Sequence, residues 1–99
     1  MIHVNISQEA LDDLNEGFFF YESQAPGLGD YFSSCLTGDI EGLKISGGTH
    51  RLVYRDYHRL LSRVFPYGIF YTLQENQATV WAVMDLRRNP DWIRNHLQP

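Results

Sequence analysis

The sequence predicts an α+β domain in which a mainly antiparallel sheet packs against an N-terminal helical hairpin. Apolar residues recur at helical spacing in the first half, whereas short alternating or aromatic-rich runs fill the second half. The expected order of elements is β-α-α-β-β-β with a short C-terminal helix. A chain of 99 residues supports one hydrophobic core, so residues 1–99 are expected to form a single domain.

The first half contains a short strand and two helices. Apolar and polar residues alternate over residues 2–6, which predicts the strand. Ser7 is the expected N-cap of the first helix, whose apolar face comprises Leu11, Leu14, Phe18 and Tyr21. Pro26 and Gly27 end this helix. Asp30 is the expected N-cap of the second helix, whose inner stripe comprises Phe32, Leu36, Ile40 and Leu43. Because the connection is short, the two helices are expected to pack antiparallel.

The second half changes to strand periodicity. Strands are expected at residues 57–64, 67–73 and 78–85, and residues 50–56 fit either a short strand or an irregular connection. On the strand at 57–64, alternation places four side chains on one face: Tyr57, Arg59, Leu61 and Arg63. Residues 91–97 are expected to form the last helix.

The composition is that of an ordinary globular protein, with 43% hydrophobic and 20% charged residues. The single cysteine, Cys35, excludes an internal disulfide and a Cys-based zinc site. The four histidines show no paired metal-binding spacing, so we expect no metal and no cofactor. With no signal segment and no run long enough to span a bilayer, a cytoplasmic protein is expected.

Charge is unevenly distributed along the chain. The net charge of −4 repels nucleic acid at long range, because proteins that bind phosphate mainly by charge are usually basic. No Lys or Arg occurs before Lys44, and all eight basic residues lie from Lys44 onward. A local basic patch in the second half is compatible with this distribution.

Four arginines are candidates for such a patch. Arg59 and Arg63 are expected on one strand face, where they could join Arg87 or Arg88 beyond the last strand. A basic strip of this kind binds nucleic acid, a protein target or acidic groups of a partner. The alternative is that these arginines are solvated and paired with helix acids such as Asp39, which contributes less than about 1 kcal/mol per exposed pair.

Exposed aromatic residues are the second candidate feature. In the run GFFFY, Phe18 and Tyr21 suit the core, which leaves Phe19 or Phe20 directed elsewhere. Exposed aromatics often mark a partner surface, although a core that extends around the helix is the alternative.

His50 and His58 are candidate acid–base groups, because an imidazole side chain ordinarily titrates near neutral pH. No Asp or Ser constellation accompanies them in the sequence, and isolated histidines are more often structural.

Five segments occur in an order typical of one protein family. They are AxxDLxEGxxFYExQxPGLGxxF (10–32), DIEGL (39–43), YHRLL (57–61), FPYGIFY (65–71) and AVMDLRRNPDW (82–92). Together they cover nearly the whole chain and resemble the RelE/ParE superfamily of bacterial toxins. The resemblance is closest to the ParE-like plasmid stabilisation branch.

The resemblance implies the toxin component of a type II toxin–antitoxin system, neutralised by a cognate antitoxin protein. Operator DNA would be bound only through the antitoxin complex. ParE-like members inhibit growth by poisoning DNA gyrase, so binding of a macromolecular target is expected rather than catalysis. The residues expected to bind the target or the antitoxin are Arg59, Arg63, Arg87, Arg88, Phe19 and Phe20.

RelE-like members instead cleave mRNA on the ribosome, and a metal-independent endoribonuclease is the alternative. Arg59, Arg63 and Arg87 are its candidate catalytic residues. The position that is often arginine in these ribonucleases is Gly68, however, and Asp85 stands where relatives commonly have histidine. A relative that is not toxic and serves only an interaction role is the third alternative.

Overall fold

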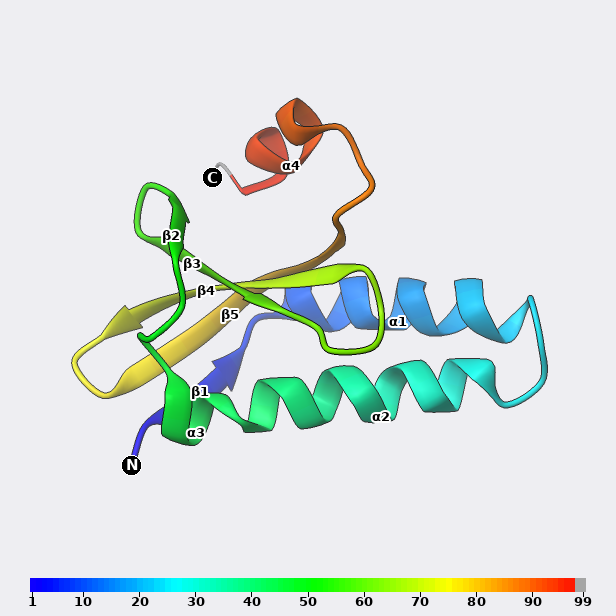
Figure 1. Ribbon diagram of the computed structural model, residues 1–99, viewed down its shortest axis with the longest axis horizontal. Helices are drawn as coiled ribbons and strands as arrows, with labels where there is room; N and C mark the ends of the chain where they lie inside the picture. The colour runs from blue at the N-terminus through cyan, green and yellow to red at the C-terminus, as the bar shows by residue number, and fades with distance from the viewer. Residues whose placement is uncertain (98–99) are drawn as a thin grey trace.

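A computed structural model describes residues 1–97 as a five-stranded sheet with helices on both faces (Figure 1). The elements in chain order are β1 (His3–Ile6), α1 (Gln8–Glu22), α2 (Leu28–Glu41), α3 (Leu43–Ser46), β2 (Leu52–Tyr54), β3 (Tyr57–Leu61), β4 (Tyr67–Gln74), β5 (Gln77–Asp85) and α4 (Pro90–Leu97). The strand order across the sheet is β1-β5-β4-β3-β2. β1 runs parallel to β5, whereas the other neighbours are antiparallel. The predicted α+β class is confirmed, and the predicted elements occur in the predicted order, with the short α3 and β2 in addition.

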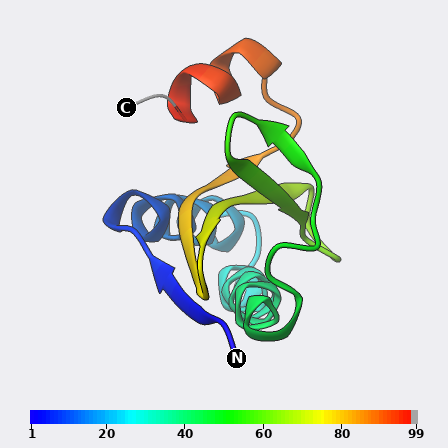
Figure 2. The ribbon, with the colours of Figure 1, turned by 90° about the vertical axis from the view of Figure 1, so that its left-hand side faces the viewer.

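The hairpin of α1 and α2 covers one face of the sheet, and α4 lies on the other face (Figures 1 and 2). Ser7 caps α1 as predicted, because its hydroxyl accepts a hydrogen bond from the Ala10 N–H at 3.1 Å. The predicted Asp30 cap is wrong: α2 begins one turn earlier, after Gly27, whose φ of 87° is left-handed. The Glu22 carboxylate accepts the N–H groups of Gly27 and Gly29, so α1 caps α2.

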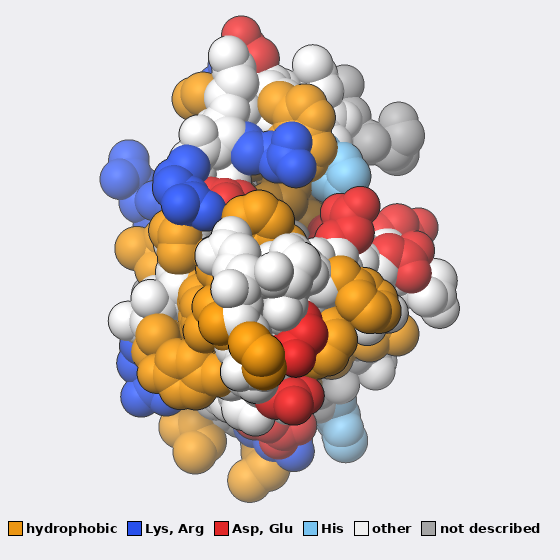
Figure 3. Space-filling model, turned by 90° about the vertical axis from the view of Figure 1, so that its right-hand side faces the viewer, with side chains coloured by type: hydrophobic (Ala, Val, Ile, Leu, Met, Phe, Trp, Pro, Cys, Tyr) orange, Lys and Arg blue, Asp and Glu red, His pale blue; other side chains and the backbone are white. Residues whose placement is uncertain are grey.

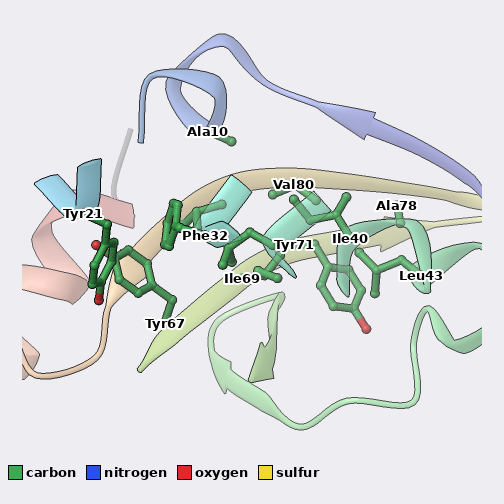
Figure 4. Packing of buried hydrophobic residues seen from close by; sticks show 12 residues of the cluster. Ala10, Tyr21, Phe32, Ile40, Leu43, Tyr67, Ile69, Tyr71, Ala78 and Val80 are labelled. Carbon is green, nitrogen blue, oxygen red and sulfur yellow. The ribbon is translucent and has the colours of Figure 1, made fainter. Parts of the chain in front are cut away.

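The larger core lies between the helical hairpin and the sheet (Figure 4). The stripe predicted for the second helix is buried there, although α2 ends at Glu41 and Leu43 belongs to α3. The predicted face of α1 is partly wrong, because Leu11 is exposed whereas Ala10 and Gly17 are buried. The reason is the close approach of the two helices: a Cβ at Gly17 would lie 2.4 Å from Cζ of Phe32.

A smaller core lies between the sheet and α4. Phe70, Ala82 and Met84 form its sheet side, and Leu97 is its buried residue on α4. The Tyr57 hydroxyl donates a hydrogen bond to the Leu97 carbonyl at 3.0 Å. The C-terminal helix is therefore packed against the open face of the sheet, where the candidate arginines are found.

Candidate functional site

Arg59 lies in β3 opposite Phe70 of β4, on the side of the sheet that faces α4. Its half-buried side chain lines a pocket of about 270 Å³ together with Arg88 and Arg94. The rest of the lining is largely apolar and comes from both the sheet and α4: Val53, Tyr54, Phe70, Leu86, Pro90, Ile93 and Leu97. Within residues 1–97, no carboxylate forms an ion pair with Arg59.

Arg63 does not join Arg59 in a common strip. β3 ends at Leu61, so Arg63 lies in the following connection instead of on the predicted longer strand. Its Nε donates to Oδ1 of Asp39 on α2 at 3.2 Å. The Asp39 side chain is only 5% exposed, whereas that of Arg63 is 84% exposed. Arg63 is thus the counter-ion of a buried helix carboxylate, which is the alternative that the sequence left open.

Arg87 is held by Asp85 in the turn that follows β5. Its Nε lies 2.9 Å from Oδ1 of Asp85 and its Nη2 lies 2.6 Å from Oδ2. The backbone N–H of Arg87 donates to the same carboxylate at 2.9 Å. Hydrogen bonding from the Arg87 guanidinium lowers the pKa of Asp85, and Asp85 raises the pKa of Arg87 in turn. The two charges therefore neutralise each other at this end of the sheet.

Arg88 has different surroundings from Arg87. Its guanidinium carbon lies 4.3 Å from the centroid of the Trp92 ring, a cation–π arrangement within reach of α4. In the described part of the chain it forms no ion pair with a carboxylate. It lies between the pocket under α4 and a second groove beside α1. Arg88 is therefore available to an external anion.

Comparison with solved structures gives two informative neighbours. A chain of the chromosomal ParDE toxin–antitoxin system from P. aeruginosa aligns with a TM-score of 0.78 and 10% identity, covering 86% of this chain and 96% of that chain. The isolated E. coli RelE toxin aligns with a TM-score of 0.63 and 14% identity, covering 96% of this chain and 95% of that chain. No protein-family model and no curated protein matches the sequence. The chain has the RelE/ParE fold.

Gly68 occupies a crowded position on this RelE/ParE sheet. A Cβ there would lie 2.8 Å from Cδ2 of Leu86 and 3.3 Å from Cδ of Arg59. An arginine at this position, as the resemblance to the ribonucleases suggests, would have to displace Leu86. The packing around Gly68 therefore leaves no room for the additional arginine that the ribonucleases often have at this position.

Phe19 and Phe20 are both exposed on α1, by 67% and 48%. They line the second groove with Tyr67, Met84 and Trp92. The exposure expected from the run GFFFY is therefore observed, and their role in binding stays a prediction.

His50 and His58 belong to a structural cluster around Tyr71 of β4. The Tyr71 hydroxyl accepts the Gly48 N–H at 2.9 Å and lies 2.5 Å from Nδ1 of His50. Because the hydroxyl accepts from Gly48, its own proton can be donated to a neutral His50. His58 stacks on the Tyr71 ring at a centroid distance of 5.0 Å. Burial lowers the pKa of His50 and raises the pKa of Tyr71.

The sequence did not predict the role of Tyr71. An aromatic residue in a β-strand normally indicates only core packing, and its hydrogen-bond partners come from a loop that lies far away in sequence. Across residues 1–97, no group of three or more His, Cys, Asp or Glu side chains is arranged to hold a metal ion. None of the helices described in that range has the length and apolar character needed to cross a membrane.

Proposed function

We propose that this chain is the toxin component of a type II toxin–antitoxin system and acts in the cytoplasm. In this role a cognate antitoxin neutralises it, and it inhibits growth by binding a macromolecular target such as DNA gyrase. The fold in common with a ParDE chain and with RelE supports the toxin role. The Asp85–Arg87 ion pair is the observation that favours binding over RNA cleavage.

Metal-independent RNA cleavage requires positive groups at the phosphate, a base for the 2′-hydroxyl and an acid for the leaving oxygen. Arg63 and Arg87 are each paired with a carboxylate, so their charge is already compensated within the protein. Arg59 and Arg88 remain, and Arg88 lies over the exposed Trp92 ring. A surface that combines arginine with aromatic residues is typical of protein–protein contacts.

The second candidate function is that of a RelE-type, ribosome-dependent endoribonuclease. The pocket under α4 favours it, because Arg59, Arg88 and Arg94 all line this pocket. In this alternative the arginines would bind the phosphate of the RNA and α4 would form one wall of the site. Arg94 is itself paired with Asp91, which reduces the charge that it offers.

Brief expression of the chain without a partner separates these functions. The proposed function predicts growth arrest, loss of supercoiling activity in purified gyrase mixed with the protein, and mRNA 5′ ends that are unchanged. Codon-phased mRNA cuts with normal supercoiling would instead establish the ribonuclease. Normal growth with neither effect would identify a relative that is not toxic.

The arginine variants sharpen this test. Arg88→Ala is expected to weaken growth inhibition at least tenfold in the inducer concentration required, because it removes an unpaired guanidinium from the exposed surface. Arg87→Ala is expected to have a smaller effect, since Asp85 already compensates its charge. Lys44→Ala is the control with the same change in net charge, at a residue of α3 that pairs with Glu41 of α2. Equal toxicity of all three variants in soluble, folded form would refute a role for Arg88.

A further inference from the structure

The pocket under α4 is positively charged in an acidic protein. The chain carries a net charge of −4, yet three of its eight Lys and Arg residues, namely Arg59, Arg88 and Arg94, line this one cavity of about 270 Å³. No Asp or Glu of residues 1–97 lines it. Figure 3 shows several basic side chains close together, with hydrophobic side chains beside them, in the upper part of the molecule, where α4 lies in Figure 1. The pocket therefore attracts anions, although the protein as a whole does not.

Arg59 supplies hydrogen-bond donors on the sheet side of the pocket. Its side chain is half-buried and passes next to Gly68 of β4, where a Cβ would lie 3.3 Å from Cδ of Arg59. Within residues 1–97 the Arg59 guanidinium makes no hydrogen bond and no ion pair. The N–H donors of a guanidinium form a rigid fork that matches the oxygens of a carboxylate or a phosphate. A half-buried fork without an internal acceptor is available to an anionic ligand.

Arg88 and Arg94 line the pocket from the side of α4. Arg88 lies over the Trp92 ring and forms no ion pair in the described part of the chain. Stacking on a ring leaves the N–H groups at the edge of the guanidinium available as donors. Arg94 is paired with Asp91, which reduces its contribution. The uncompensated charge of the pocket is therefore that of Arg59 and Arg88, which suits one anionic head group.

The remaining walls of the pocket are mostly apolar. Phe70 of β4 is 2% exposed, and Ile93 and Leu97 form the wall on α4. Sites for single-stranded nucleic acid combine a basic groove with open aromatic rings on which bases stack. Here the Phe70 ring is buried, and the half-buried Tyr54 ring lies beneath the Arg55 guanidinium. Pockets for drug-sized ligands measure about 300–1,000 Å³, so this pocket suits a smaller molecule with an apolar body.

We propose that the pocket under α4 binds a small amphiphilic anion. One carboxylate or phosphate head accepts hydrogen bonds from Arg59 and Arg88, and a short alkyl chain or a single ring packs against Phe70, Ile93 and Leu97. The ligand bridges the sheet and α4, because the pocket has walls on both. The inference is independent of the proposed function, since it requires neither toxicity nor an antitoxin.

The test is an NMR titration of the full chain with hexanoate, hexanamide and acetate. Hexanamide keeps the apolar body and removes the charge, whereas acetate keeps the charge and removes most of the body. Hexanoate is expected to shift the Nε–H signal of Arg59 and the methyl signals of Ile93 and Leu97. It is expected to bind at least about tenfold more tightly than either of the other two, because it alone satisfies both parts of the pocket. Hexyl phosphate is then compared with hexanoate, and the tighter of the two identifies the head group.

Hydrogen exchange gives a second readout. A ligand that contacts both α4 and the sheet opposes the opening of α4, so hexanoate is expected to slow exchange of the α4 amides. Acetate at the same concentration is expected to leave their exchange unchanged, because it lacks the body that contacts Ile93 and Leu97.

Three variants make the charge argument specific. Arg59→Gln is expected to weaken binding of hexanoate at least about tenfold and to leave binding of hexanamide unchanged. Arg51→Gln is the matched control, because it makes the same change in net charge at an exposed residue outside the pocket, and it is expected to preserve binding. Arg88→Gln, at an exposed residue of the rim, is expected to weaken binding of hexanoate several-fold without disturbing the sheet.

Equal binding of hexanoate and hexanamide, or an unchanged affinity for hexanoate in both Arg59→Gln and Arg88→Gln, would overturn the proposal. A short single-stranded RNA that shifts the same signals and binds at least about tenfold more tightly than hexyl phosphate would overturn it in favour of nucleic acid as the ligand. The outcome is separable from that of the toxicity assays. A chain that is not toxic but binds hexanoate in this pocket would refute the toxin role and retain the anion site.

Discussion

Arg87 and Arg88 are adjacent in the chain, yet their guanidinium groups have opposite surroundings. The Arg87 guanidinium makes three hydrogen bonds with the Asp85 carboxylate, and the Arg88 guanidinium lies over the Trp92 ring. A carboxylate two residues away from an arginine reaches it when the chain turns, as it does here after β5. The net charge that this loop offers to a ligand is therefore close to that of one arginine.

Asp85→Asn tests this compensation directly. The substitution removes the counter-charge of Arg87, so affinity for a short single-stranded RNA is expected to rise and to become more salt dependent. One additional phosphate contact steepens the slope of log K against log salt by about 0.7. Fluorescence anisotropy at several salt concentrations measures it. Asp56→Asn gives the same change in net charge away from the loop and is expected to leave the slope unchanged, and an unchanged slope for Asp85→Asn would contradict the argument.

The cluster of His50 and Tyr71 predicts a dependence of stability on pH. Burial lowers the pKa of His50, so on acidification the unfolded chain takes up a proton first, near its ordinary value of about 6.5. The contribution of His50 to the free energy of unfolding is therefore expected to be fully present above about pH 7.5. It is expected to decrease as the pH falls through about 6.5. Urea denaturation at a series of pH values measures the decrease. His50→Asn should remove most of it and His3→Asn, at an exposed site, should retain it.

At the scale of elements, two glycines of the helical hairpin have opposite environments. Gly17 on α1 faces the Phe32 ring, where an added Cβ would lie at 2.4 and 2.5 Å from ring carbons. Gly38 on α2 has no atom within 4 Å of the position of a Cβ. The close approach of the helices therefore depends on the absence of a side chain at Gly17, and also at Gly29 of α2, where an added Cβ would lie 2.6 Å from the Phe18 carbonyl oxygen.

Gly17→Ala is expected to destabilise the protein by about 1–3 kcal/mol, because the new methyl group forces α1 away from Phe32. Gly38→Ala is the matched substitution, and it is expected to stabilise the protein by about 0.5–1 kcal/mol. Position 38 lies in a helix interior, where alanine fits without strain, and alanine lowers the conformational entropy of the unfolded chain. Urea denaturation of both variants measures the two effects. A stabilising Gly17→Ala would show that the hairpin adjusts without cost.

The helices and strands follow from periodicity and capping residues, and these were largely predictable. Three features were not, because each depends on contacts between distant residues. The start of α2 is set by Glu22 reaching across from α1, which no local motif around Asp30 reveals. Arg63 leaves the strand face because β3 ends early and Asp39 pairs with it. The candidate arginines were predictable as residue types, whereas their ion pairing was not.

At the scale of the whole molecule, two cores of unequal size flank one sheet. The core under the hairpin contains many fully buried side chains from both the helices and the sheet. In the smaller core, α4 contributes a single buried side chain, that of Leu97. Segments with few buried contacts open with a smaller free energy than the rest of a domain. The pocket under α4 and the second groove beside α1 both have walls on α4, so both candidate surfaces depend on the less strongly packed part of the molecule.

Leu97→Ala is therefore expected to act locally. Hydrogen exchange of the α4 amides should accelerate, while the global free energy of unfolding falls by less than about 1 kcal/mol, because α4 detaches before the sheet unfolds. Leu36→Ala in the larger core is the control, with an expected global loss of about 2–5 kcal/mol. A global loss of the same size for both variants would show that α4 and the sheet unfold as one unit.

Trp81 has a consequence for how the length of this chain can vary. In the pairing of β4 with β5, Phe70 lies opposite Ala82 and Tyr71 lies opposite Val80, so Trp81 is an extra residue in the strand. Val80 consequently packs on the hairpin side and Ala82 on the α4 side. Deleting Trp81 would leave every other side chain of β5 on its present face, whereas deleting Val83 would turn the strand end over and carry Asp85 with it. Within β5, the bulge is thus where homologous sequences can differ in length while preserving the loop of Arg87 and Arg88.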